Sequence, residues 1–171
     1  MPSHPITPRD IVLIAHDIRS CHNVGSLLRT ADGLGVTKVY LTGYTPYPIT
    51  SDDTRMPHEA AKLDRQIHKT ALGAESSQPW EQVVDIGPLL ARLANDGYAQ
   101  ATLEQSPDSV KLPDFDPPDK VVLVLGSEVT GVSPELLRKI PLHLEIPMFG
   151  RKESFNVVQA AAMALYHLRF A

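Results

Sequence analysis

Three short segments of the sequence combine small residues with polar side chains that could act on a ligand. They read His22-Asn-Val-Gly-Ser-Leu-Leu-Arg-Thr30, Leu125-Gly-Ser-Glu-Val-Thr-Gly131 and Ile146-Pro-Met-Phe-Gly-Arg-Lys-Glu-Ser-Phe-Asn156. Glycines that flank a carboxylate, as in the second segment, let the backbone approach a ligand closely. A long irregular loop ahead of an apolar helix, as in the third, commonly serves binding. We therefore take these three segments as the candidate site.

Each segment also has a purely structural interpretation. Arg29 can be a solvated helix residue, the 125–131 segment a plain strand-to-helix turn, and Ser154 and Asn156 helix caps. Other kinds of chemistry find no support in the sequence. Its seven histidines and one cysteine show no metal-ligand spacing, so no metal is expected, and no Gly-x-Ser-x-Gly motif of a hydrolase occurs.

Alternating strands and helices must position these segments. Apolar runs predict strands over 11–15, 38–42, 98–103, 120–126 and 142–147, with a brief strand over 70–73. Helical spacing predicts helices over 25–34, 51–69, 86–95, 134–140 and 156–169, with a polar turn over 17–24, a loop over 106–119 and Ser133 as an N-cap. This alternation indicates an α/β fold: a mostly parallel sheet with helices on both faces. Such sheets bind ligands beyond the carboxyl ends of their strands.

Composition sets the broad class of protein. With 171 residues, 43% of them hydrophobic and 21% charged, the chain is expected to form one domain over 1–171 with an irregular arm over 1–10. No apolar run approaches the roughly 20 residues of a membrane span, and the N-terminus does not read as a secretory signal. Cys21 has no partner for a disulfide, so the expected location is the cytoplasm. The formal charge of −4 argues against general binding to polyanions.

Taken together, the three segments resemble the motifs of the SPOUT-class RNA methyltransferases of the SpoU/TrmH type. The matching patterns are Asn23-x-Gly25-x-x-x-Arg29-Thr30, Gly126-x-Glu128-x-x-Gly131, and Ile146-Pro-Met148 followed by Gly150, Ser154 and Asn156. Their order and spacing match across about 11–169. The resemblance implies a deep trefoil knot in the C-terminal third, an exception to the rule against knots. It also implies S-adenosylmethionine bound in the knot, a homodimer with active sites at the subunit interface, and methyl transfer to a ribose 2′-hydroxyl of tRNA or rRNA.

The same resemblance assigns roles to individual residues. It implies a catalytic set of Asn23, Arg29, Glu128, Ser154 and Asn156. The residues it implies around the cofactor are Thr102, Leu103, Leu125, Gly126, Gly131, Ile146, Met148, Ser154 and Phe155. Thr102 and Leu103 are placed there only by their position at a strand end.

Basic residues are the candidates for holding RNA: Arg29, Arg55, Lys62, Arg65, Lys69, Arg151 and Lys152. Each can equally be a solvated surface charge. Three features depart from the family pattern: Val129 stands where many relatives have glycine, Phe155 where leucine is usual, and Val158-Gln159 where Ser-Val is more typical. Two alternatives stay open: a non-catalytic RNA-binding or assembly module on the same fold, and methylation of a base instead of a ribose.

Overall fold

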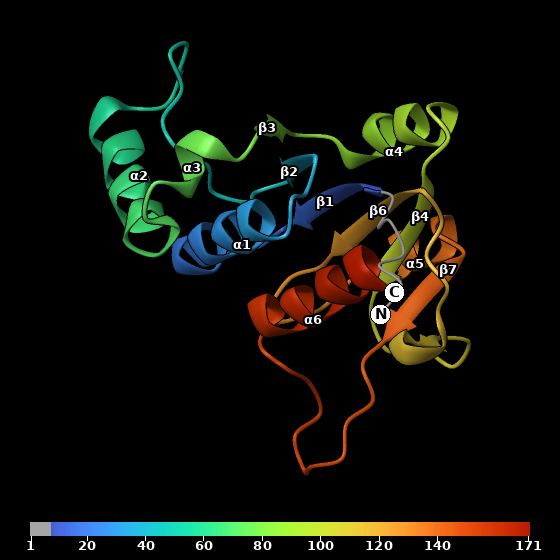
Figure 1. Ribbon diagram of the computed structural model, residues 1–171. Coiled ribbons are helices and arrows are strands. Elements are labelled where there is room, and N and C mark those ends of the chain that lie inside the picture. The colour runs from blue at the N-terminus through green and yellow to red at the C-terminus, as the bar shows by residue number, and fades with distance from the viewer. Residues whose placement is uncertain (1–7) are drawn as a thin grey trace, which may run out of the picture.

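Seven parallel strands form one sheet in the computed structural model, which describes residues 8–171 (Figure 1). Their order across the sheet is β3-β2-β1-β6-β4-β7-β5. The strands are β1 (Asp10–His16), β2 (Lys38–Thr42), β3 (Trp80–Val83), β4 (Ala99–Leu103), β5 (Val110–Lys111), β6 (Lys120–Leu125) and β7 (Leu142–Glu145). The helices are α1 (Cys21–Gly33), α2 (Pro57–Ala71), α3 (Ala74–Ser77), α4 (Ile86–Asn95), α5 (Pro134–Lys139) and α6 (Val157–Phe170), with a 3₁₀ turn at Leu112–Asp114.

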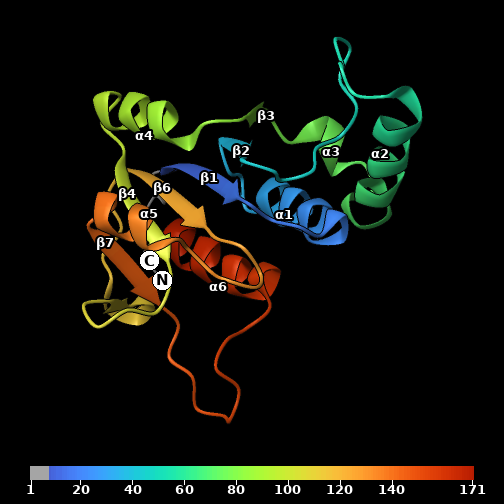
Figure 2. The same ribbon diagram turned by 180° about the vertical axis from the view of Figure 1, so that it is seen from behind.

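The two faces of the sheet carry separate hydrophobic clusters. Alternate residues of β1 point to opposite faces, as the period of a strand requires. Ile11, Leu13 and Ala15 pack with α1 and α6 on the face seen in Figure 1. Val12 and Ile14 pack with α4 and α5 on the face seen from behind in Figure 2. The predicted parallel sheet with helices on both faces is confirmed, whereas the predicted knot stays a prediction.

The strand order brings the ends of late and early strands together. β6 enters the sheet between β1 and β4, and β7 enters between β4 and β5. Because all pairs are parallel, the carboxyl ends of β1, β4, β6 and β7 share one edge of the sheet. The three candidate segments follow β1, β6 and β7, so the topology gathers them at that edge.

Several predicted elements differ from the observed ones. The turn over 17–24 is wrong in its second half, since α1 begins at Cys21 with the Ser20 hydroxyl accepting a hydrogen bond from the Asn23 backbone N–H (3.2 Å). The strand over 70–73 is also wrong, because α2 runs to Ala71 and closes on Leu72 in the left-handed conformation (φ 53°). The short elements α3, β3 and β5 were not predicted. The part of the predicted arm at 1–7 lies outside the described residues, and β1 already begins at Asp10.

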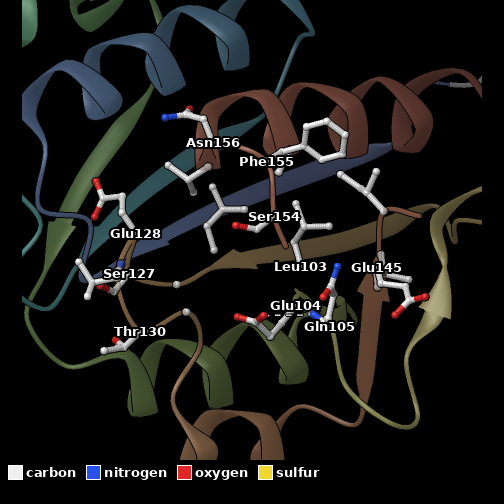
Figure 3. Close-up of a pocket in the computed structure, with 18 of the residues that line it drawn as sticks. Leu103, Glu104, Gln105, Ser127, Glu128, Thr130, Glu145, Ser154, Phe155 and Asn156 are labelled. Carbon is white, nitrogen blue, oxygen red and sulfur yellow. Dashed lines mark hydrogen bonds between the residues drawn. The ribbon is translucent and has the colours of Figure 1, made fainter. Parts of the chain in front are cut away.

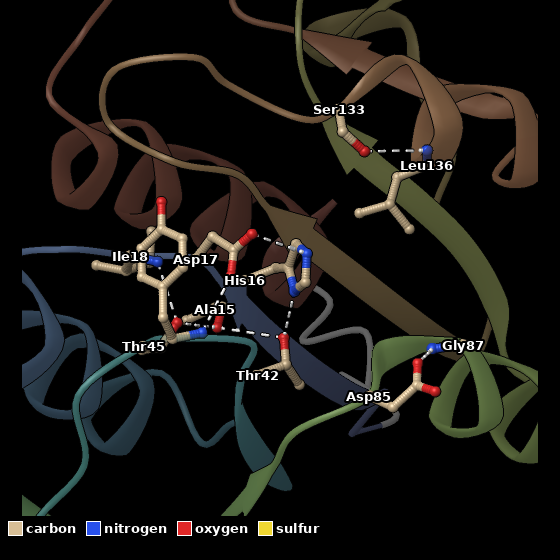
Figure 4. A network of polar contacts seen from close by, with 11 residues as sticks. Ala15, His16, Asp17, Ile18, Thr42, Thr45, Asp85, Gly87, Ser133 and Leu136 are labelled. Carbon is tan, nitrogen blue, oxygen red and sulfur yellow. Dashed lines mark hydrogen bonds and ion pairs between the residues drawn. The ribbon is translucent and has the colours of Figure 1, made fainter.

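Side-chain hydrogen bonds join the carboxyl ends of β1 and β2 (Figure 4). The His16 ring lies 2.9 Å from the Thr42 hydroxyl and 3.3 Å from the Asp17 carboxylate. Burial lowers the pKa of His16, and the charge of Asp17 acts in the opposite direction. The Thr45 hydroxyl donates to the Ala15 carbonyl (2.9 Å) and accepts from the backbone N–H that follows Asp17. These bonds fix the turn from which α1 departs.

Two further capping bonds appear in the same view. Ser133 accepts from the Leu136 N–H (3.3 Å) at the start of α5, which confirms the predicted N-cap (Figure 4). Asp85 accepts from the Gly87 N–H (2.9 Å) at the start of α4.

Arg169 fixes the far end of α6. Its guanidinium donates to the carbonyls of Leu34 (2.9 Å), Gly35 (2.6 Å) and Arg9 (2.8 Å). Since the first two carbonyls belong to the turn after α1, this fork holds the last helix against the first one. Within residues 8–171, no helix is long and apolar enough to cross a membrane.

Gly25 has a packing role that its sequence position did not reveal. It lies inside α1 rather than at the helix entry, and it faces α2. A Cβ atom there would lie 2.2 Å from both the Ile67 carbonyl oxygen and the Thr70 hydroxyl oxygen. Glycine is therefore required because two helix backbones meet, and no ligand needs to be invoked.

We predict that Gly25→Ala lowers the free energy of unfolding by about 2–3 kcal/mol, because the added methyl group forces α1 and α2 apart. Urea unfolding followed by circular dichroism measures this change. Gly33→Ala is the matched control, since nothing lies within 4 Å of a Cβ at that position of the same helix. We expect Gly33→Ala to be neutral or slightly stabilising. Equal losses in the two variants would contradict the packing role.

Candidate active site

A cleft of about 570 Å³ opens at the carboxyl edge of the sheet, where β4, β6 and β7 end (Figure 3). Its volume falls in the range of about 300–1,000 Å³ usual for small-molecule sites. The residues that line it are Leu103, Glu104, Gln105, Leu125, Gly126, Ser127, Glu128, Val129, Thr130, Gly131, Leu144, Glu145, Ile146, Met148, Ser154, Phe155, Asn156, Val157 and Ala160. The cleft thus takes its walls from the 126–131 loop, the 146–156 loop and the first turn of α6.

Glu128 joins the second candidate segment to the first. Its carboxylate accepts hydrogen bonds from the backbone N–H groups of Arg19 (2.8 Å) and Ser20 (3.1 Å) and from the Asn23 side-chain amide (2.9 Å). Burial alone would raise the pKa of Glu128, but these donors outweigh it and hold the pKa below its usual value. Glu128 is therefore an anion at neutral pH that fixes the start of α1.

Glycines shape the loop that carries Glu128. Gly131 adopts a left-handed backbone (φ 67°), and Ser127 and Gly131 pair as a short antiparallel bridge with N–H···O distances of 3.1 and 2.9 Å. A Cβ on Gly126 would lie 2.3 Å from the Gly131 carbonyl carbon. The loop closes on itself because both positions lack side chains, and Glu128 stands at its tip.

The third segment contributes Ser154, Phe155 and Asn156 to the cleft. Asn156 is the N-cap of α6, with its side-chain oxygen accepting from the Val158 N–H (2.9 Å). The cap interpretation of Asn156 therefore holds, and the same residue also lines the cleft. Ser154 and Asn156 both lie on the wall of the cleft (Figure 3).

Most residues named for catalysis and for the cofactor gather here. Three do not line the cleft: Thr102, Arg29 and Asn23, the last of which contacts the Glu128 carboxylate. Of the nine residues expected around the cofactor, eight line the cleft; the exception is Thr102, which is fully buried in β4. Arg29 is exposed on α1 and does not line the cleft of its own chain. Val129 and Phe155, two of the departures from the family pattern, both lie on the wall of the cleft.

Sequence reasoning missed several lining residues. Glu104 and Gln105 follow β4, and Glu145 ends β7. The signal was available, since these positions lie at the carboxyl ends of predicted strands, where ligands bind. These residues belong to none of the three motifs, so only the strand order shows that they line the cleft.

The predicted basic residues divide into two groups. The guanidinium of Arg55 is occupied by contacts within its own loop. It pairs with Asp53 (2.5 Å) and donates to the carbonyls of Tyr47 and Pro48. It also lies 3.6 Å from the centre of the Tyr47 ring. This pairing lowers the pKa of Asp53 and raises that of Arg55. The others, Lys62, Arg65, Lys69, Arg151 and Lys152, are exposed.

Comparison with known proteins agrees with this geometry. Residues 10–166 match the model of the SpoU rRNA Methylase family. The chain belongs to this family. The resemblance drawn from the three motifs is thereby confirmed.

Named relatives include the tRNA (guanosine(18)-2′-O)-methyltransferase of Aquifex aeolicus, 29% identical over 92% of this chain and 68% of that protein. The enzyme of the same name from Escherichia coli is 27% identical over 92% of this chain and 62% of that protein. The chain thus spans about two thirds of the length of these relatives.

Solved structures share the fold. The A. aeolicus TrmH/SpoU tRNA modifying enzyme superposes with a TM-score of 0.76 at 25% identity, covering 94% of this chain and 74% of that one. An AdoMet-bound rRNA methyltransferase from Sinorhizobium meliloti gives a TM-score of 0.76 at 22% identity, covering 96% of this chain and 57% of that one.

We predict that Glu128→Gln lowers the free energy of unfolding by about 1 kcal/mol at pH 7, a small loss because the carboxyl group is solvent-exposed. A glutamine has one acceptor oxygen, so it cannot serve donors on both carboxylate oxygens. Because folding lowers the pKa of Glu128, its contribution is complete above the unfolded-state pKa of about 4.3 and disappears as the pH falls through the folded-state pKa.

Urea unfolding at pH 7 and at pH 3 measures this dependence, and the difference between the variant and the unmodified chain must shrink at the lower pH. The control is Glu153→Gln, an exposed carboxyl group in the 146–156 loop, which should change stability at neither pH. A difference that stays constant with pH would mean that Glu128 does not act as an anion.

Proposed function

We propose that this chain is an S-adenosylmethionine-dependent methyltransferase that modifies a ribose 2′-hydroxyl of tRNA or rRNA in the cytoplasm. The observation that carries the proposal is the cleft in which Glu128, Ser154 and Asn156 meet, with Glu128 bonded to Asn23 of the first motif. Membership of the SpoU family and the names of the relatives support the reaction and the substrate class.

The residues of the cleft fit the cofactor. Leu103, Ile146, Met148 and Phe155 offer an apolar wall for an adenine ring, and the glycine-bounded 126–131 loop exposes backbone groups beside it. The carboxylates that line the cleft suit a cationic ligand. S-adenosylmethionine, when bound, supplies a methyl group carried on a positively charged sulfur.

The protein's part in such a reaction is chiefly to place the acceptor hydroxyl. Methyl transfer needs the attacking oxygen in line with the carbon, so positioning supplies most of the rate. Asn156 and Ser154 are placed to hold the substrate nucleotide, and Glu128 keeps Asn23 and the start of α1 fixed. Arg29 would orient a phosphate and stabilise the negative charge that develops as the hydroxyl loses its proton. A guanidinium is too weak a base to remove that proton without help.

The position of Arg29 outside its own cleft agrees with an active site completed by a second copy of the chain. We propose a homodimer formed through the outer face of α6, where Met163, Tyr166 and Phe170 are exposed at helical spacing, together with the exposed Phe155 just before the helix. Phe155 also lines the cleft, so this face continues into the site. Sedimentation equilibrium, which reports the mass directly, tests the pairing.

RNA would be held by one face of α2. His58, Lys62, Arg65 and Lys69 recur every three or four residues and are exposed, which places them on one side of the helix. α2 packs on α1, the helix that carries Arg29. A phosphate chain bound along this face would therefore lead toward Arg29.

We predict that Arg29→Ala reduces methyl transfer by about 100-fold or more, the loss typical of removing a group that stabilises developing charge. The purified chain is incubated with radiolabelled S-adenosylmethionine and transfer or ribosomal RNA, and mass spectrometry of the nucleosides identifies the modified atom. Arg138→Ala removes an exposed arginine of α5 on the other face of the sheet and should retain full activity. Full methylation by Arg29→Ala would remove Arg29 from the mechanism. A methyl group found on a base would show that the acceptor is a base and not a ribose. A chain that binds RNA but neither binds the cofactor nor transfers a methyl group would be a non-catalytic module.

We predict that the double variant Arg65→Ala/Lys69→Ala binds RNA about tenfold more weakly near 0.1 M salt. The slope of log affinity against log salt concentration should fall by about 1.5, since two phosphate contacts are lost. Fluorescence anisotropy with labelled RNA measures both quantities. The control Arg138→Ala/Lys139→Ala removes the same charge from α5, and equal weakening in both would show that only net charge matters.

A further inference from the structure

The cleft carries negative charge and no positive charge. Three glutamates line it, Glu104, Glu128 and Glu145, and none of the described lining residues is a lysine, arginine or histidine. Arg151 and Lys152 belong to the 146–156 loop, but neither residue lines the cleft. Any ligand that enters this space therefore meets a field that favours cations.

Two of the three carboxylates are engaged with groups outside the cleft. Glu128 is turned to Arg19, Ser20 and Asn23 at the start of α1. Glu145 accepts a hydrogen bond from the Ser109 hydroxyl (2.5 Å), in the loop that follows β4. Both charges thus point at protein donors at the margins of the site.

Glu104 is the carboxylate that remains on the cleft floor. One of its oxygens accepts from the Val132 N–H (2.9 Å). The other accepts from the adjacent Gln105 N–H (3.2 Å), the bond drawn in Figure 3. A Cβ on Gly131 would lie 2.2 Å from a Glu104 oxygen, so the carboxylate reaches this position only because residue 131 is glycine. Backbone donors hold Glu104 in place, while its charge has no cationic partner among the lining residues.

We propose that Glu104 makes the cleft select the cationic form of its ligand: it favours S-adenosylmethionine over S-adenosylhomocysteine, the product that remains after methyl transfer. This inference rests on the proposed function. When the methyl group leaves, its bonding electrons stay on sulfur, which loses its positive charge. The two ligands then differ by one methyl group and one unit of charge, both at sulfur, and a fixed carboxylate attracts the sulfonium but not the uncharged thioether. Product release is favoured for the same reason.

The experiment is isothermal titration calorimetry of the purified chain with three ligands: S-adenosylmethionine, S-adenosylhomocysteine, and sinefungin, in which an amine-bearing carbon replaces the sulfonium. We expect the unmodified chain to bind the two cationic ligands about tenfold more tightly than the neutral one, the effect of one charge pair in a partly solvated site. In Glu104→Gln the affinity for the cationic ligands should fall by about tenfold, and that for S-adenosylhomocysteine should not change.

Two further variants separate charge from structure. Glu104→Asp keeps the charge and should keep the preference for cationic ligands, even if all affinities fall together. Glu153→Gln removes one carboxylate of the 146–156 loop that does not line the cleft, and it should leave all three affinities unchanged. Thermal melting of each variant establishes that it is folded.

Each remaining outcome would overturn the inference. The unmodified chain could bind the three ligands equally well, or Glu104→Gln could weaken the binding of all three equally. Either result would show that Glu104 has only a structural role, through its bond to the Val132 N–H, and would leave the proposed function intact. Failure of the unmodified chain to bind any of the three would refute the proposed function as well.

Discussion

The carboxylate of Glu128 joins two loops that lie far apart in the sequence. It stands on the loop after β6 and accepts from the turn after β1 and from the Asn23 amide, 105 residues away in sequence. This contact exists because β6 enters the sheet beside β1, so that the ends of an early and a late strand are neighbours. Without the parallel pairing, the first and second motifs would have no common edge, and the cleft would lack one wall.

Glycines decide how closely the parts of this edge approach one another. Gly25, Gly126 and Gly131 all occur in the motifs, where glycine suggests close approach to a ligand. In the structure, each leaves room for another part of the protein: α2 for Gly25, the opposite limb of the loop for Gly126, and the Glu104 carboxylate for Gly131. The motif glycines therefore build the site by allowing backbone and side chain to pack, and the ligand meets surfaces that this packing creates.

The sequence predicted those features that depend on local pattern. Continuous apolar runs located β1 and β6, shorter stretches rich in apolar residues located β2, β4 and β7, and the Ser133-Pro134 pair located the start of α5. The sequence did not predict β3, because its four residues, Trp80–Val83, are all half-buried at a sheet edge and include glutamate and glutamine. The start of α1 was predicted too late in the chain. Ser20 caps a first turn that contains cysteine, histidine and asparagine, none of which is a strong helix former.

Parts of the site lay beyond local pattern for a different reason. Glu104 and Glu145 enter the cleft only because β7 is inserted between β4 and β5, a fact of strand order that no short window records. Arg55 was predicted to bind RNA because it lies in a basic segment. In the structure, its guanidinium is instead occupied by the Asp53 carboxylate and by two backbone carbonyls. Thr102 and Leu103 were both predicted to contact the cofactor, but only Leu103 lines the cleft, because the side chain of Thr102 is fully buried in β4.

Separation of charge reconciles an acidic chain with an anionic substrate. The formal charge of −4 is spread unevenly: the cleft is lined by carboxylates, while the exposed face of α2 carries His58, Lys62, Arg65 and Lys69. A phosphate group would be repelled from the cleft and attracted to α2, whereas a ribose carries no charge and can enter beside the carboxylates. Arg29 lies on the helix that packs against α2 and whose first turn is fixed by Glu128. The same distribution that favours a cation in the cleft thus disfavours phosphates there and admits only the uncharged parts of an RNA chain.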